Sequence, residues 1–250
     1  MKNNFKLLGS VAVLCMFAAV APASAVTIKA VYTGTVSSGT EFNITDQSGM
    51  FGLGTGADVL NDQAFTLTFT YNPSLFGVVH EVTPTSNVAR GGPFDIPGSQ
   101  SPIYNAELLI NGVTKKIFSN AAGFVGNYNP SSGYNNAFHS TFSQYIDANF
   151  NVTENTVDGG IGDIGLLIPL GLEKPYHVVL DTLLSLSNGH FDFNVFDDNL
   201  GDYSVHTFGT FSATELTVST VPLPGALPLF AAGLIGLGAV SKKRAQRKLS

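Results

Sequence analysis

The stretch Ala64-Phe65-Thr66-Leu67-Thr68-Phe69-Thr70-Tyr71 decides the fold class, because apolar and polar residues alternate along its whole length. Successive side chains of a β-strand point to opposite faces, so the pattern predicts a strand with one apolar and one threonine-rich face. Helical periodicity is hard to find between residues 26 and 220, where further apolar or β-branched runs are bounded by Gly, Asn, Pro and Ser. The sequence therefore predicts an all-β domain. The other predicted strands cover residues 27–36, 104–110, 114–118, 138–142, 177–183, 191–196 and 205–218.

Turn chemistry and the number of strands extend this prediction. Asn111-Gly112 lies between two predicted strands and is a hairpin marker, because a two-residue type I′ turn requires positive φ at both positions. Gly209 lies inside the long run 205–218 and is a candidate kink or bulge. The turn-rich stretches 91–102 and 127–136 are expected to be exposed loops. This many antiparallel strands predict a single two-sheet sandwich of jelly-roll-like arrangement, large enough to fold without cross-links.

The N-terminus has the order of a secretory signal peptide. Lys2 and Lys6 precede an apolar run over residues 7–20, and Ala23 and Ala25 then form an A-x-A cleavage site. We expect the Sec machinery to export the chain and signal peptidase to cut after Ala25. The alternative is an uncut anchor helix, although the apolar run is short for a span of about 20 residues.

Composition excludes several classes of protein. The only cysteine, Cys15, lies in the apolar run and is removed with it, so the mature chain forms neither disulfides nor a cysteine-based zinc site. Residues 26–220 contain 18 acidic and five basic residues, a formal charge of −13. Such a surface repels phosphate backbones, which excludes nucleic acid as a partner and favours cations or neutral glycans.

Residues 221–250 form a tail with three parts. Val221-Pro222-Leu223-Pro224 is followed by an uncharged segment at about 225–241 and by a basic end at 242–250. The uncharged segment is just long enough for a membrane helix, which needs roughly 17 to 25 residues. The positive-inside rule keeps the basic end in the cytoplasm and places the β domain on the far side of the membrane. The basic cluster consists of Lys242, Lys243, Arg244, Arg247 and Lys248.

This tail closely resembles the sorting signal of the PEP-CTERM class of exported proteins, in its VPLP-type variant, with residues 221–224 in the motif position. The resemblance implies processing by an exosortase, a membrane cysteine protease that cuts near the motif in Gram-negative bacteria that make exopolysaccharide. It also implies an inner-membrane intermediate before the cell surface or the medium is reached. Leu223 replaces the Glu of the usual motif, which implies a variant processing enzyme. The alternative is a single-pass anchor that stays uncut.

Motifs for catalysis are missing from residues 26–220. The G-x-S-x-G elbow, H-E-x-x-H and the P-loop are absent, and the α/β alternation that carries a dinucleotide fingerprint is missing too, so we predict no enzymatic activity. His80 and His139 stand alone, whereas His177, His190 and His206 converge on a zinc or acid–base site if their strands are neighbours. The alternative is that each histidine occupies a half-exposed polar position of a strand.

One acidic turn is a candidate calcium site, because several carboxylates and an amide on a single turn supply the oxygen ligands that calcium prefers. The alternative is an acidic turn that only caps and solvates a hairpin. The stretch 158–163, Asp-Gly-Gly-Ile-Gly-Asp, is expected to be a glycine-rich loop. No cofactor other than calcium is expected. The candidate calcium ligands are Asp197, Asp198, Asn199 and Asp202.

Three functions remain open at this stage. The leading hypothesis is an exported, non-enzymatic surface or extracellular-matrix protein that is sorted by its tail and associates with exopolysaccharide. The second is an anchored carbohydrate-binding module, suggested by Tyr128 and Tyr134 in a turn-rich stretch where aromatic faces can stack on sugars. A glycan-active hydrolase is the third, although the spacing of the carboxylates singles out no catalytic pair.

Overall fold

A computed structural model describes residues 26–37, 45–118, 120–129, 136–146, 152–162, 168–180, 186–197 and 202–221. Within these ranges the chain contains no helix and forms fifteen antiparallel strands of one sheet. The strands are β1 (Thr27–Ser37), β2 (Thr45–Asp46), β3 (Gly56–Ala57), β4 (Ala64–Tyr71), β5 (Val79–Val82), β6 (Ser86–Gly91), β7 (Ile103–Ile110), β8 (Val113–Ile117), β9 (Ala122–Tyr128), β10 (Ala137–Ile146), β11 (Val152–Gly162), β12 (Tyr176–Val179), β13 (Leu186–Asn188), β14 (His190–Asp197) and β15 (Asp202–Val221).

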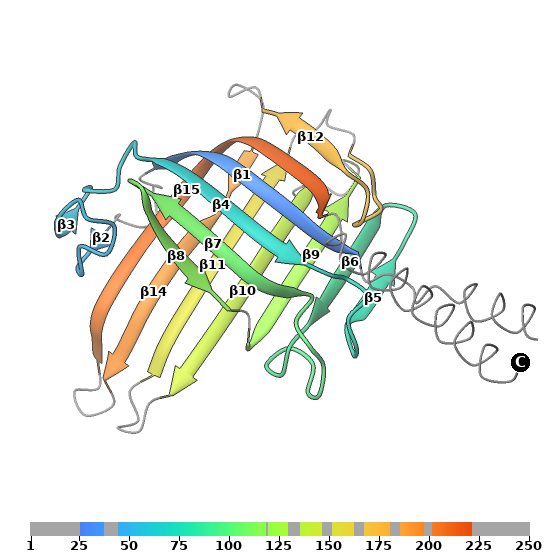
Figure 1. Ribbon diagram of the computed structural model, residues 1–250, viewed down its shortest axis with the longest axis horizontal. Coiled ribbons are helices and arrows are strands. Elements are labelled where there is room, and N and C mark those ends of the chain that lie inside the picture. The colour runs from blue at the N-terminus through green and yellow to red at the C-terminus, as the bar shows by residue number, and fades with distance from the viewer. Residues whose placement is uncertain are drawn as a thin grey trace, which may run out of the picture.

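The sheet curls on itself. Its main strands follow the order β5-β6-β9-β10-β11-β14-β15-β1-β4-β7-β8, and the short strands β2, β3, β12 and β13 join it at the sides. Figure 1 shows β7 and β8 crossing in front of β10 and β11. In agreement with this view, β7 comes close to β9 and β10, and β8 comes close to β10 and β11. The two halves of the sheet therefore face each other across the core.

The prediction of an all-β antiparallel fold is confirmed, whereas the division into two separate sheets is not. The first half of β15 pairs with β14, from Asp202 to Thr210, and its second half pairs with β1, from Thr210 to Val221. Because one long strand changes partners along its length, hydrogen bonding continues without a break from one half of the fold to the other. The curl of a single sheet thus replaces the second layer of a sandwich.

The core lies on the inner side of this curl. In β4, Phe65, Leu67 and Phe69 are buried while the intervening threonines are only half-buried, as the alternation predicts. Burying a side chain of this size contributes roughly 1.5–3 kcal/mol. The same period continues in β14, where Phe191 and Phe193 are buried and pack against each other in the core. Alternation of period two is therefore the main cause of the fold.

Gly209 in β15 is not the position of a kink. The register of β15 shifts at other places, opposite Thr33/Gly34 of β1 and opposite Val195/Phe196 of β14. Gly209 itself pairs in register with Phe191, and a Cβ at this position would lie 2.6 Å from the Phe191 ring. A glycine is needed here because the ring of Phe191 packs directly on the backbone.

Two turn predictions have different outcomes. Asn111 and Gly112 join β7 to β8 with φ values of 49° and 74°, which confirms the tight hairpin. The stretch from Asp158 to Gly162, expected to be a loop, instead belongs to strand β11. It pairs with β10, and its residue Ile161 is buried in the core together with the preceding Val157. Its glycines therefore occur within a paired strand and not at a turn.

Asp46 anchors the short strand β2 to β15, and β3 pairs with β2. Its buried carboxylate accepts hydrogen bonds from the backbone N–H groups of Ser48 and Met50, at 3.2 and 3.1 Å, and from the Thr207 hydroxyl of β15, at 3.0 Å. Hydrogen bonds to a carboxylate contribute about 1.5–3 kcal/mol each, so Asp46 holds the turn after β2 against β15.

Candidate functional site

An open groove of about 350 Å³ lies on the outer face of the sheet, where β6, β9 and β10 run side by side. It combines a guanidinium, a carboxylate and a hydroxyl with two phenylalanine rings. This mixture of a few polar groups with aromatic surface is typical of small-molecule sites, which enclose about 300–1,000 Å³. The groove is lined by Arg90, Asp95, Ala122, Gly123, Phe124, Ser140 and Phe142.

The strand register assembles this groove. Arg90 of β6 lies opposite Phe124 of β9, which in turn lies opposite Ser140 of β10. The next pair outward on the same face is Ala122 with Phe142. Each large ring therefore faces a small side chain across the strands, and the two small residues leave the space that forms the groove.

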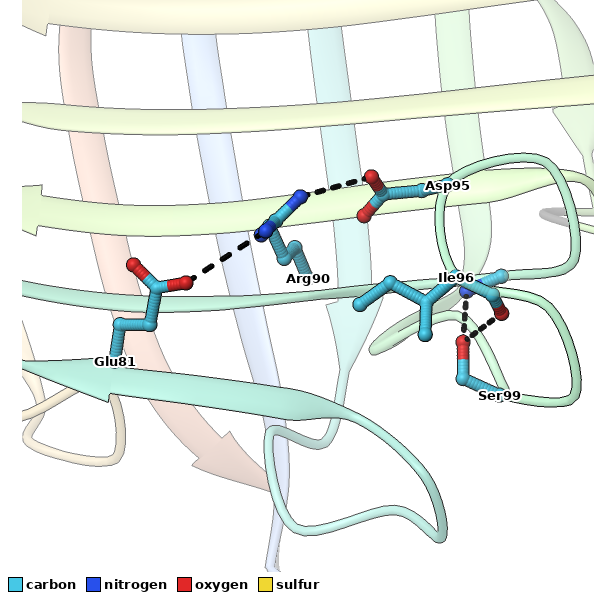
Figure 2. A network of polar contacts seen from close by, with 6 residues as sticks. Glu81, Arg90, Asp95, Ile96 and Ser99 are labelled. Atoms are coloured by element: carbon cyan, nitrogen blue, oxygen red, sulfur yellow. Dashed lines mark hydrogen bonds and ion pairs between the residues drawn. The ribbon is translucent and has the colours of Figure 1, made fainter.

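Arg90 is held between two carboxylates. Its Nη1 donates to Oδ1 of Asp95 at 3.0 Å, and its Nη2 lies 3.7 Å from Oε1 of Glu81 on β5. Figure 2 shows the two acids on opposite sides of the guanidinium. The Arg90 side chain is still 41% exposed, and a guanidinium carries five N–H donors, so donors remain for a ligand.

The loop between β6 and β7 brings Asp95 to the groove. The Ser99 hydroxyl accepts from Gly92 N–H and donates to the Ile96 carbonyl, both at 2.8 Å, and the second of these bonds is drawn in Figure 2. Phe94 N–H donates to the Ala121 carbonyl at 3.0 Å, which ties the loop to the start of β9. Most residues between positions 93 and 100 are exposed, as expected for this loop, whereas Ser99 is buried.

Aromatic rings continue along the outer face from the groove. Phe94 packs edge-to-face on Phe142 at 5.8 Å between ring centroids, and Phe124 packs in the same way on Phe138 at 5.6 Å. Tyr128 lies on this face as well, since a Cβ added to Gly126 would meet the Tyr128 ring at 2.7 Å and Phe124 at 2.9 Å. Burial, followed by the charge of Glu81, raises the pKa of Tyr128.

Sequence reasoning found only the edge of this site. Tyr128, proposed as a sugar-stacking residue, lies at the end of β9 close to Phe124, whereas Tyr134 lies outside the described residues. The remaining groove residues carry no motif. The sequence feature that could have indicated the groove is Arg90, because it is the only arginine before residue 244 and comes directly before the turn-rich stretch 91–102.

The histidines do not form a joint site. His190 and His206 lie on the paired strands β14 and β15, opposite Thr210 and Asn194, and both pack against Phe208, but each pairs with its own acid. Nδ1 of His190 lies 2.8 Å from Asp158, and this hydrogen bond raises the pKa of His190. The other pairs are His206 with Asp192 at 3.1 Å and His177 with Glu215 at 3.6 Å. His177 lies opposite Thr217, towards the far end of β15.

His139 contradicts the expectation that the histidines are half-exposed. It is completely buried, and its Nδ1 shares a hydrogen bond of 2.7 Å with the Tyr32 hydroxyl. Its ring stacks on Phe69 at 5.5 Å and lies 5.2 Å from Tyr71, while its Nε2 has no hydrogen-bond partner among the described residues. Burial lowers the pKa of His139 to about 3, so the ring is neutral at physiological pH.

The predicted calcium turn lies only partly in the described chain. Asp197 and Asp202 are paired in register where β14 and β15 meet, and Asp198 and Asn199 lie outside the described residues. In the part of the chain that the structure describes, no three His, Cys, Asp or Glu side chains come together as metal ligands. Calcium binding at this turn stays a prediction.

The two ends of the described domain meet on neighbouring strands. Thr27, at the start of β1, pairs with Val221, at the end of β15. Val221 is the first residue of the proposed sorting motif and is 38% exposed. The described residues do not include the rest of the proposed motif, the basic cluster or the proposed cleavage site. These are Pro222, Leu223 and Pro224, residues 242–250, and Ala23 and Ala25. In the part of the chain that the structure describes, no helix is long and apolar enough to span a membrane.

Comparisons with known proteins found no relatives. No protein-family model matches the chain, and neither a curated protein nor a solved structure is significantly similar to it.

Proposed function

We propose that this chain is an exported, non-enzymatic surface or extracellular-matrix protein whose β domain binds a ligand outside the cell. In this proposal signal peptidase removes residues 1–25, the β domain folds after export, and an exosortase recognises the tail and cuts it near Val221-Pro222-Leu223-Pro224. Before that cut the uncharged segment at about 225–241 holds the chain in the inner membrane, and the basic cluster keeps its end in the cytoplasm.

The boundary of the β domain is the observation that carries this proposal. Its first strand begins at Thr27, two residues after the proposed signal-peptide cleavage site, and its last strand ends at Val221, where the proposed motif begins. Proline has no N–H to donate to a strand, so the proline motif is not expected to continue one. The core residues that the structure describes lie between these two points, from Ile28 to Val218.

A binding role fits the groove better than a catalytic one. Both carboxylates near the groove are directed at the same guanidinium, that of Arg90, and not at each other across an open space. Glycoside hydrolysis uses two carboxyl groups that face a bond between them, one acting as an acid. We therefore keep the prediction of a non-enzymatic protein, with calcium at the turn after β14 as an optional ligand.

Intact-mass measurement of the protein from the cell surface and the medium tests this function. The wild-type chain is expected to begin near Val26 and to end near the motif when the exosortase is present, and to retain Ser250 when it is deleted. The double substitution Pro222→Ala/Pro224→Ala should preserve the tail, whereas the control Pro228→Ala, outside the motif, should not. If Ser250 is retained in every strain, the protein is an uncut anchor and sorting is refuted.

A further inference from the structure

We propose that the groove across β6, β9 and β10 binds an uncharged glycan. Arg90 and Asp95 hydrogen-bond to the sugar hydroxyls, while Phe94, Phe124 and Phe142 pack on its C–H faces. This inference rests on the proposed function, because it requires the β domain to act as an exported binding domain, and it specifies the chemical class of the ligand.

The polar side of the groove suits vicinal hydroxyl groups. The Arg90 guanidinium is planar and rigid, and its contacts with Asp95 and Glu81 hold it in one orientation before any ligand arrives. A sugar hydroxyl both donates and accepts, so two neighbouring hydroxyls can accept from Arg90 and donate to Asp95. The Asp95 side chain is 29% exposed and is positioned by the hydrogen-bonded loop described above.

The apolar side of the groove suits the ring of a sugar. Phe142 and Phe124 lie diagonally across β9 and β10, and Phe94 packs edge-to-face on Phe142. Phe94 is 62% exposed, a large apolar surface for a side chain that is held in place by its neighbours. The negative face of an aromatic ring attracts the partly positive C–H groups of a pyranose, and the stacked surfaces exclude water.

Charge decides between neutral and acidic glycans. The groove and its margin carry one guanidinium, from Arg90, and two carboxylates, from Asp95 and Glu81. Residues 26–220 as a whole have a formal charge of −13. A uronic acid or a phosphorylated sugar would meet repulsion from both, whereas an uncharged sugar meets none. The groove is open, so a longer chain can continue beyond the one or two sugar units that it contacts.

A glycan array followed by titration calorimetry tests the assignment. The full-length protein is used in a non-glycosidic detergent, since the maltoside head groups of common detergents would compete for the groove. We expect binding to neutral glucans, mannans or galactans, and at least tenfold weaker binding to alginate, a polymer of uronic acids. Phe94→Ala should weaken binding by about tenfold, which corresponds to the loss of one stacked ring.

Two further variants and one control separate the groove from the fold. Ala122→Leu should fill the groove and abolish binding, and Arg90→Lys should weaken it because the planar fork is lost. The control Phe118→Ala removes a ring that is 67% exposed and does not line the groove, so its affinity should equal that of the wild type. The thermal midpoint of each variant shows whether the fold is retained.

The possible outcomes are distinct. Binding to a neutral glycan that is lost in Phe94→Ala and Ala122→Leu but kept in Phe118→Ala supports the inference. Absence of binding to every neutral glycan, stronger binding to alginate or to peptides, or equal effects of Phe94→Ala and Phe118→Ala overturns it. None of these results depends on the tail, so the binding site and the proposed sorting can fail independently.

Discussion

Acid should destabilise this protein through one buried side chain, His139. Burial lowers its pKa to about 3 in the folded state, against an ordinary value of 6.5, because the ring lies among Tyr32, Phe69 and Tyr71, where a charge would be poorly solvated. Below pH 6.5 the unfolded chain therefore binds a proton that the folded chain does not. The stability that the neutral ring provides is complete above pH 6.5 and is lost progressively as the pH falls towards 3.

The size of this effect follows from linkage. Each pH unit between 6.5 and 3 lowers the free energy of unfolding by about 1.4 kcal/mol, so the step from pH 7 to pH 5 lowers it by about 2 kcal/mol. The raised pKa of His190 acts in the opposite direction, because a folded state that binds the proton more tightly is stabilised in acid. A comparison with a variant that retains His190 removes this second contribution.

Urea unfolding of the wild type and of His139→Asn at pH 7 and pH 5 measures the effect. The substituted side chain would place an amide close to the position of Nδ1 but would carry no group that titrates. The variant is therefore expected to be less stable at pH 7, yet to lose about 2 kcal/mol less than the wild type on acidification. If both proteins lose the same free energy between the two pH values, the folded protein does not hold His139 neutral and the proposed cause of the acid sensitivity is wrong.

Two further substitutions test the packing and the polar anchor of the fold. Gly209→Ala should lower the free energy of unfolding by about 1–3 kcal/mol and lower the thermal midpoint, because the new Cβ would lie 2.6 Å from the Phe191 ring. In the control Gly171→Ala the new Cβ would meet only the flexible Lys174 side chain, at 3.2 Å, so the midpoint should change little. Equal midpoints for both variants would show that the Phe191 ring moves aside. Asp46→Ala should lower the free energy of unfolding in urea by about 3 kcal/mol, because it leaves the N–H groups of Ser48, Met50 and Phe51 without their acceptor, whereas Ser48→Ala should lower it by about 1 kcal/mol. A loss for Asp46→Ala no larger than that for Ser48→Ala would show that water replaces the carboxylate.

The sequence predicted the strands whose pattern is local. Residues 64–71 alternate without a break and form β4 with the predicted bounds, and Asn111-Gly112 forms the predicted hairpin turn. Both signals depend only on neighbouring residues, through side-chain direction in a strand and positive φ in a turn. Strands β6, β9 and β11 were missed, because Gly, Asn and Ser interrupt their alternation, and only their partners in the sheet make them strands.

The groove could not be predicted for the same reason. Arg90, Phe124 and Ser140 become neighbours through the register of β6 with β9 and of β9 with β10, and Asp95 reaches them through a loop that is fixed by its own hydrogen bonds. No pattern within a single segment contains this information. The same holds for His139, which looks like any polar residue of a strand until β1 and β4 cover it.

The sequence by itself determined the β class, the strand faces, the acidic charge of the domain and the order of its terminal segments, since each is a property of composition or of neighbours along the chain. The tertiary structure alone decided that the strands form one curled sheet, that His139 is buried and neutral, and that a guanidinium and three aromatic rings meet on the outer face. Those features depend on contacts between residues far apart in the sequence, and such contacts are set by the register and the curl of the sheet.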